Sequence, residues 1–439
     1  MFVCVRVGGV EVRHSQVEER NRYRFAILAS VILVRSCIGL IWASAGPLLP
    51  LIMNAFGISR GTAGWFASAA PLTIALVSLP LAIIGARYSL KKTFAVGAVL
   101  QAGGLLVPFA SNYPLVIVTR VIFAVGTAIT VPVATAIATE WFSSRKLPTI
   151  NGAMMSFINM GNALAYFLTV PLAVAISWKA PMAIYGAVAL TCALAWIVFG
   201  KDKPRAARVT GASGMPEAEA EEKVSFGKVL AGRSTLLLAF ATMGSWCLGN
   251  SIGSWLPGYY NEVFGMPLQK ASAIMAVITV GGTAACLAGG FLTVRIGLRK
   301  PFLILSGFLF GLSALSAVMF NNLVIIYISV TLFGVFGNLH NPSLFTIPME
   351  LPKTPLRSGV IIFSVMQCGG NLGNFIGPLL VGYLVDLTGS YLPGFLSAIV
   401  VSFSLLIAGL LLPETGPKGK TVTRTLRAHV RTAQSTASH

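Results

Sequence analysis

The chain has 439 residues, of which 55% are hydrophobic and only 10% are charged, and its mean hydropathy is +0.80. A soluble globular protein carries about 25% charged residues, so the composition excludes a water-soluble domain and indicates an integral membrane protein. The net charge of +19 would suggest nucleic-acid binding in a soluble chain. The basic segments lack interleaved aromatic residues, however, so no nucleic-acid partner is expected. The six cysteines show no metal-binding or redox spacing, and no metal or other cofactor is expected.

Apolar runs follow one another along the whole chain. A helix needs about 20 apolar residues to cross ~30 Å of hydrocarbon, and most runs reach that length, the third and ninth being the shortest. Internal proline and glycine are tolerated in bundled membrane helices. The sequence therefore predicts an all-α polytopic membrane protein with twelve transmembrane helices, near 25–53, 62–84, 93–110, 114–139, 149–175, 181–199, 234–260, 270–293, 301–320, 323–348, 358–384 and 391–412.

The basic residues orient these helices. Of the 32 Lys and Arg residues, all lie on one side of the predicted membrane except Arg35, Arg60, Arg120, Lys179 and Lys270. Because cytoplasmic loops concentrate Lys and Arg, that side is predicted to be cytoplasmic, and the chain to be a multi-pass cell-membrane protein with both termini inside. The predicted domains are a cytoplasmic tail at 1–24, a six-helix bundle at 25–199, a cytoplasmic linker at 200–233, a second six-helix bundle at 234–412 and a cytoplasmic tail at 413–439.

The two groups of six helices share an internal repeat. Several motifs recur in the same order, each about 210 residues further along the chain. They are Cys37-Ile-Gly39 and Cys247-Leu-Gly249, Arg87-Tyr-Ser-Leu-Lys91-Lys92 and Arg295-Ile-Gly-Leu-Arg299-Lys300, and Asn159-Met-Gly-Asn162 and Asn371-Leu-Gly-Asn374. Each half has an even number of spans and starts on the same side, so the sequence predicts two pseudo-symmetric bundles related as parallel repeats.

With these paired motifs the chain resembles the major facilitator superfamily of secondary transporters. The resemblance rests on Gly85…Arg87-x-x-Leu-Lys91-Lys92, on Gly290…Arg295-x-Gly-x-Arg299-Lys300, and on Arg120-x5-Gly126 in the fourth span. Within the superfamily, Arg35-Ser-Cys-Ile-Gly with the following Pro47-Leu-Leu-Pro50 is similar to the cyanate-permease and nitroimidazole-transporter branch. The resemblance implies alternating access, with the two loop motifs acting in gating. The acidic residue usual in these loops is missing from both copies, where Ala86, Thr293 and Val294 stand.

Two arginines lie inside predicted spans, where charge is costly. Arg35 is about 15 Å into the first span and Arg120 about 9 Å into the fourth, at 1.5 Å per residue. No Asp or Glu lies in the central part of any span. The arginines are therefore predicted to attract an anionic substrate, since a guanidinium is a bidentate donor. The alternatives are structural pairing of Arg35 with helix carbonyls or a nearby acid and an interfacial position for Arg120.

Several polar residues within spans could also contact a solute. His340, Asn341 and Asn250 are predicted to line the cavity, and Trp246 and Trp255 are further candidates for the cavity or its rim. A buried neutral histidine bonded to a neighbouring asparagine is the alternative for His340, and the unperturbed pKa of histidine, about 6.5, also suits proton coupling. Asn159, Asn162, Asn371 and Asn374 are predicted to pack helices, with substrate hydrogen bonding as the alternative.

The predicted function is secondary transport of a small anionic or weakly acidic solute, cyanate-like or a small organic anion. Efflux of an amphipathic or nitroaromatic compound is the alternative, and a polytopic sensor is a distant one. No P-loop or hydrolase motif is present, so no enzyme activity is expected. The expected partners are a small-molecule substrate and the lipid bilayer, with the protein acting as a monomer.

Overall fold

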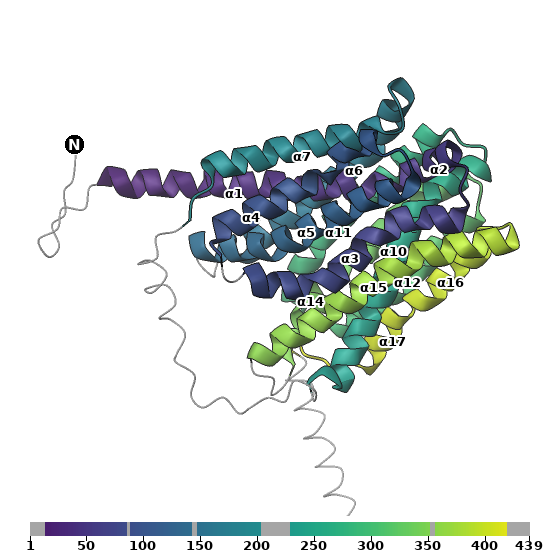
Figure 1. Ribbon diagram of the computed structural model, residues 1–439. Coiled ribbons are helices and arrows are strands. Elements are labelled where there is room, and N and C mark those ends of the chain that lie inside the picture. Colours follow the sequence, from purple (N-terminus) through teal and green to yellow (C-terminus); the bar gives the residue numbers. More distant parts are fainter. Residues whose placement is uncertain (1–13, 86–87, 143–146, 203–228, 352–355, 419–439) are drawn as a thin grey trace, which may run out of the picture.

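A computed structural model describes residues 14–85, 88–142, 147–202, 229–351 and 356–418 (Figure 1). The described chain is helical and holds eleven helices or helix pairs with the length and hydropathy to span a membrane. α15 (Leu356–Thr388), with 33 residues, lies at the place of the remaining predicted span. The prediction of an all-α polytopic fold is therefore confirmed. Arg87 and most of the predicted linker and tails lie outside the described residues.

The first half of the chain forms the helices of the six expected N-terminal spans. The first and third spans are each made of two consecutive helical segments. The segments are α1 (His14–Ala43), α2 (Ala45–Phe56), α3 (Arg60–Gly85), α4 (Leu90–Gln101), the 3-10 helix η1 (Ala102–Phe109), α5 (Tyr113–Trp141), α6 (Leu147–Ala175) and α7 (Ala180–Phe199).

The second half repeats this plan, with α15 as its fifth span. Its fourth and sixth spans are divided in two. The helices are α10 (Arg233–Glu262), α11 (Leu268–Ile296), α12 (Lys300–Met319), α13 (Leu323–Leu339), α14 (Asn341–Glu350), α15, α16 (Leu392–Ser402) and α17 (Ser404–Leu411).

Proline explains two of the helix breaks. Proline has no N–H and its ring clashes with the carbonyl four residues earlier. Pro47 follows the break between α1 and α2, and Pro342 follows the break between α13 and α14 at His340. α1 also differs from the expected span, because it begins at His14 inside the predicted tail. A helix continues past its apolar segment as long as no breaker stops it, and none occurs between His14 and Tyr23.

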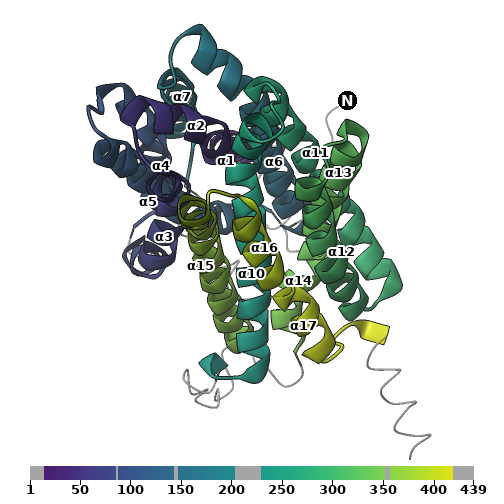
Figure 2. The same ribbon diagram turned by 90° about the vertical axis from the view of Figure 1, so that its right-hand side faces the viewer.

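The two halves lie side by side, with the first-half helices on one side and α12, α13, α16 and α17 on the other (Figure 2). α1 packs on α6 in the first half, and α10 packs on α15 in the second. Both contacts need glycine, because a Cβ on Gly39 would overlap the Ile158 carbonyl and one on Gly373 would overlap the Met243 carbonyl. The halves meet through α3 with α15, α6 with α11 and α2 with α10.

Candidate functional site

A cavity of about 360 Å³ lies between the two halves. Its walls come from α1, α2 and α6 of the first half and from α10 to α15 of the second. The volume falls in the range of small-molecule sites, roughly 300–1,000 Å³. The lining residues that the following argument uses are Trp42, Asn159, Asn162, Tyr166, Ser245, Trp246, Gly249, Asn250, Phe310, Phe333, Asn338, Asn341 and Asn374.

Asparagine dominates the polar part of this wall. The six lining asparagines come from five helices, and among the described residues that line the cavity none carries a charge. Asn250 and Asn341, predicted to contact substrate, lie on this wall. Asn159, Asn162 and Asn374, predicted to pack helices, lie there as well, whereas Asn371 is absent from it and donates to the Gln367 carbonyl.

The asparagines are only partly bonded to the protein. The Asn250 amide donates to the Asn374 carbonyl oxygen at 2.6 Å, which joins α10 to α15. Asn341 donates to the Asn338 side-chain oxygen over a long 3.4 Å. The side-chain oxygens of Asn162 and Asn341 are buried without a partner. A buried polar atom without a partner costs about 1–3 kcal/mol, so these amides are available to a bound solute.

Aromatic residues form the rest of the wall. Trp42 and Trp246 come from opposite halves, and Phe310 stacks on Phe333 with ring centroids 4.5 Å apart. The Tyr166 hydroxyl donates to the Gly253 carbonyl across the halves at 3.4 Å. Sequence reasoning singled out Trp246 but missed the other four, since an aromatic residue within an apolar span does not reveal which face it occupies.

Trp255, the other tryptophan candidate, is absent from the cavity wall. It is 1% exposed, and its indole N–H donates to the Pro378 carbonyl at 2.8 Å. It therefore fastens α10 to α15.

Arg120 is bonded to helix carbonyls rather than lining the cavity. It is 1% exposed, and its guanidinium donates to the Ile41 carbonyl at 2.7 Å and to the Phe66 carbonyl at 3.1 Å. The same group lies 4.7 Å from the Phe66 ring centroid and 5.6 Å from that of Phe123, which are distances for cation–π attraction. Arg120 thus ties α5 to α1 and α3. This position departs from the cavity role predicted for it, because carbonyls at the helix crossing satisfy the guanidinium.

Arg35 is held much more loosely. It is 2% exposed, its guanidinium donates to the Val131 carbonyl at 3.3 Å, and its Nε is buried without a partner. Arg35 is also absent from the lining residues. It lies on the same face of α1 as Trp42, two turns or about 10 Å away along the helix. Its repeat counterpart Ser245 does line the cavity, whereas Arg35 is buried outside the lining with a donor to spare.

His340 sits in the break between α13 and α14. It is 1% exposed, its Nδ1 is 3.1 Å from the Phe336 carbonyl oxygen, and its Nε2 is buried without a partner. The ring is absent from the cavity wall, although Asn338 and Asn341 on either side belong to it. The histidine therefore lies behind the asparagines rather than among them.

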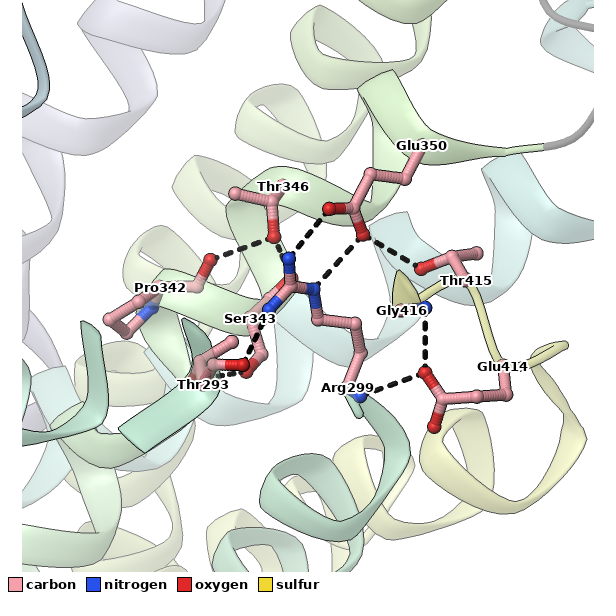
Figure 3. Close-up of polar contacts among 9 residues, drawn as sticks. All are labelled: Thr293, Arg299, Pro342, Ser343, Thr346, Glu350, Glu414, Thr415 and Gly416. Carbon is pink, nitrogen blue, oxygen red and sulfur yellow. Dashed lines mark hydrogen bonds and ion pairs between the residues drawn. The ribbon is translucent and has the colours of Figure 1, made fainter. Parts of the chain in front are cut away.

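The second loop motif forms a polar cluster with α14 and with the segment that follows α17 (Figure 3). Arg299 makes a bidentate ion pair with Glu350 at the end of α14, at 2.6 and 3.0 Å. It also donates to the Thr293 carbonyl at 3.1 Å. The hydrogen bond with Glu350 raises the pKa of Arg299 above its ordinary value, so the guanidinium stays charged. Of the other motif residues, Arg295 is exposed and Gly290 faces open space.

Neither loop motif has its own acidic residue, but a carboxylate from outside the motif bonds to each loop. The Glu414 carboxylate accepts the backbone N–H groups of Arg299 and Lys300 at 2.8 and 3.1 Å, and thereby caps α12. In the first half Asp202 accepts the backbone N–H of Lys91 at 2.9 Å, at the start of α4. Both acids follow the last helix of their half. The repeat spacing could have revealed this pair, but a motif search confined to the loops misses it.

Comparisons with known proteins agree with this architecture. The family model of the Major Facilitator Superfamily matches residues 31–362 and 287–436. A probable sulfoacetate transporter from Cupriavidus necator is 24% identical over 90% of this chain and 96% of its own. A hexuronate transporter from Bacillus subtilis is 24% identical over 84% and 90%. A 4-hydroxybenzoate transporter from Pseudomonas putida is 25% identical over 64% and 68%.

A solved structure shares the fold. A bacterial homologue of the human lysosomal transporter Spinster, in an inward-facing and unoccupied conformation, superposes with a TM-score of 0.71. It is 15% identical, and the match covers 88% of this chain and 95% of that one.

Proposed function

Because the chain belongs to the Major Facilitator Superfamily, whose fold and relatives here are those of transporters and not of enzymes, we propose that it moves a small organic anion across the membrane by alternating access. The observation that carries the proposal is the amide-lined cavity between the halves, with the loosely bonded Arg35 two turns along α1 from the lining residue Trp42. In this scheme the halves rock about the cavity and expose it to each side in turn.

The charge distribution supports an anion over a cation. A cation buried in the membrane needs an inward carboxylate, and none of the described residues that line the cavity is acidic. Amide N–H groups and a nearby guanidinium favour a carboxylate or sulfonate instead. The sulfoacetate, hexuronate and 4-hydroxybenzoate transporters are named for organic anions, which supports this choice.

Among small anions, the size of the cavity favours an organic acid of several heavy atoms rather than cyanate. A space of about 360 Å³ is far larger than a three-atom anion, since one water takes about 30 Å³ of liquid. Asn162 and Asn341 also present unpartnered oxygens, which accept hydrogen bonds from hydroxyl groups that cyanate lacks. Membership in the cyanate-permease and nitroimidazole-transporter branch stays a prediction.

A second candidate is efflux of a nitroaromatic or other amphipathic compound. The aromatic wall of Trp42, Trp246, Phe310 and Phe333 favours it, because planar ligands stack on aromatic rings at about 0.5–1.5 kcal/mol per pair. Both candidate functions would use the same cavity, and they differ in which chemical group of the solute hydrogen-bonds to the asparagine side chains.

The orientation is also part of the proposal. The concentration of Lys and Arg in one set of loops supports cytoplasmic termini, an orientation in which Arg60, Lys179 and Lys270 lie outside. We expect the protein to act as a monomer within the lipid bilayer.

Thermal unfolding of the purified protein with a panel of ligands tests the function. A ligand that binds the folded state raises its melting temperature, by an amount equivalent to about 2.7 kcal/mol at a hundred times its Kd. We expect glucuronate, sulfoacetate or 4-hydroxybenzoate to raise it, and putrescine and glucose not to. Stabilisation by putrescine and by no anion would contradict the proposal, and stabilisation by a neutral nitroaromatic alone would favour efflux.

A further inference from the structure

A polar cluster joins the two halves at the end of the molecule where α3 begins. The Arg60 guanidinium lies 2.6 Å from the Glu262 carboxylate at the end of α10. Its Nε donates to the Tyr391 hydroxyl at 3.2 Å, and that hydroxyl donates to Glu262 at 3.1 Å. One first-half cation is therefore held by two residues of the second half.

A second-half carboxylate also caps the first turn of α3. Asp386, near the end of α15, accepts the backbone N–H of Arg60 at 3.0 Å and that of Gly61 at 2.7 Å. The N-terminus of a helix has unpaired N–H groups and attracts negative charge. A residue just before the helix usually supplies the cap, whereas here it comes from the other half of the protein.

The backbones of α3 and α15 approach closely at the same place. A Cβ on Gly61 would overlap the Tyr383 ring and the Asp386 carboxylate, and a Cβ on Gly382 would overlap the Arg60 carbonyl. In Figure 1 these two helices run side by side. Opening this end of the protein requires α3 to leave α15, which breaks the ion pair and removes the cap together.

We propose that Arg60, Glu262, Tyr391 and Asp386 form a latch between the halves, and that its strength sets the populations of the two alternating states. Burial raises the pKa of Tyr391, so its hydroxyl keeps a proton to donate to Glu262. The latch rests on the alternating access of the proposed function and deepens it, because it acts on the protein without reference to which solute is carried.

The expected effect of the latch is moderate. The Arg60 and Glu262 side chains are 37% and 27% exposed, and solvent weakens an ion pair of this kind. The cap adds about 1 kcal/mol. Loss of either component should raise the ratio of the open to the closed state at this end on the order of fivefold.

Electron–electron distance measurements on the full-length, cysteine-free protein test the latch. Spin labels at Ala55→Cys on α2 and Leu387→Cys on α15 report the separation of the halves at this end, and both positions are exposed. Arg60→Gln, Glu262→Gln and Asp386→Ala should each increase the longer-distance population. The Arg60→Gln/Glu262→Gln double variant should shift the distances by less than the sum of the two single variants, because both changes remove the same ion pair.

Lys270→Gln is the matched control. It removes an exposed positive charge at the start of α11, at the same end of the protein, and should leave the distances unchanged. Unchanged distances in all three latch variants, or an equal shift in the control, would overturn the latch. Neither result would bear on ligand binding, so failure of the latch is distinguishable from failure of the proposed function.

Discussion

Arg35 and Arg120 are both arginines buried within the first bundle, yet their surroundings differ. Arg120 reaches two carbonyls and two aromatic rings, whereas Arg35 makes one long hydrogen bond and keeps a buried Nε without a partner. Both were predicted to attract substrate, because their depth in the membrane is visible in the sequence. Side-chain direction depends on helix packing, which the sequence does not reveal.

We therefore expect substitution of Arg35 to weaken anion binding and substitution of Arg120 to lower the stability of the fold. Arg35→Ala should weaken anion binding by about tenfold or more, since hydrogen bonds to charged groups contribute about 1.5–3 kcal/mol. Arg35→Lys should retain part of the affinity through its charge. Calorimetric titration of the anion that stabilises the protein measures both.

Arg120→Ala is the comparison for Arg35. It leaves the carbonyls of Ile41 and Phe66 without their donor and should lower the melting temperature more than it alters the Kd. An unchanged affinity for the anion in Arg35→Ala would show that Arg35 does not take part in binding it.

At the level of elements, glycine decides how closely helices approach. Gly39 and Gly249 are counterparts in the internal repeat, and the sequence alone treats them alike. In the structure Gly39 faces the carbonyl of Ile158 on α6, whereas Gly249 lines the cavity with open space beside it. The internal repeat thus predicts that corresponding helices exist in the two halves. Only the packing of these helices decides whether a glycine lies at a helix–helix contact or on the cavity wall.

This difference gives a matched pair of variants. Gly39→Ala should push α1 from α6 and lower the free energy of unfolding by about 1–3 kcal/mol, the usual cost of overpacking. Gly249→Ala should leave stability nearly unchanged, because nothing lies within 4 Å of the added methyl group. Thermal unfolding in one detergent compares the two, and equal destabilisation would contradict the assigned packing.

At the scale of the whole molecule, the distribution of Lys and Arg predicts the orientation in the membrane, and the contacts between the halves indicate which end of the cavity is closed. The loops at one end of the protein carry most of the basic residues, which predicts that this end is cytoplasmic, and the polar cluster around Arg60 joins the halves at the other end. Together these support a state that is closed on the outside.

Cysteine labelling of intact cells tests the orientation. In a cysteine-free background, Lys270→Cys should react with a membrane-impermeant maleimide added outside, and Lys300→Cys should react only after the cells are opened. The reverse pattern would invert the topology and the direction assigned to the latch. Equal labelling of both before opening would show that the membrane was leaky, which an inner-membrane control protein with a known cytoplasmic cysteine detects.

The sequence by itself determined the membrane class, the helical fold, the repeat and the family, because these depend on composition and on spacing along the chain. It also placed Asn250 and Asn341 where the cavity lies. The tertiary structure decided which side chains meet. It put Asn162 and Asn374 on the cavity wall, fixed Arg120 to carbonyls and supplied Glu350 and Glu414 to the loop that lacks its own acid. Such contacts join residues far apart in the chain, and helix rotation and approach set them rather than local pattern.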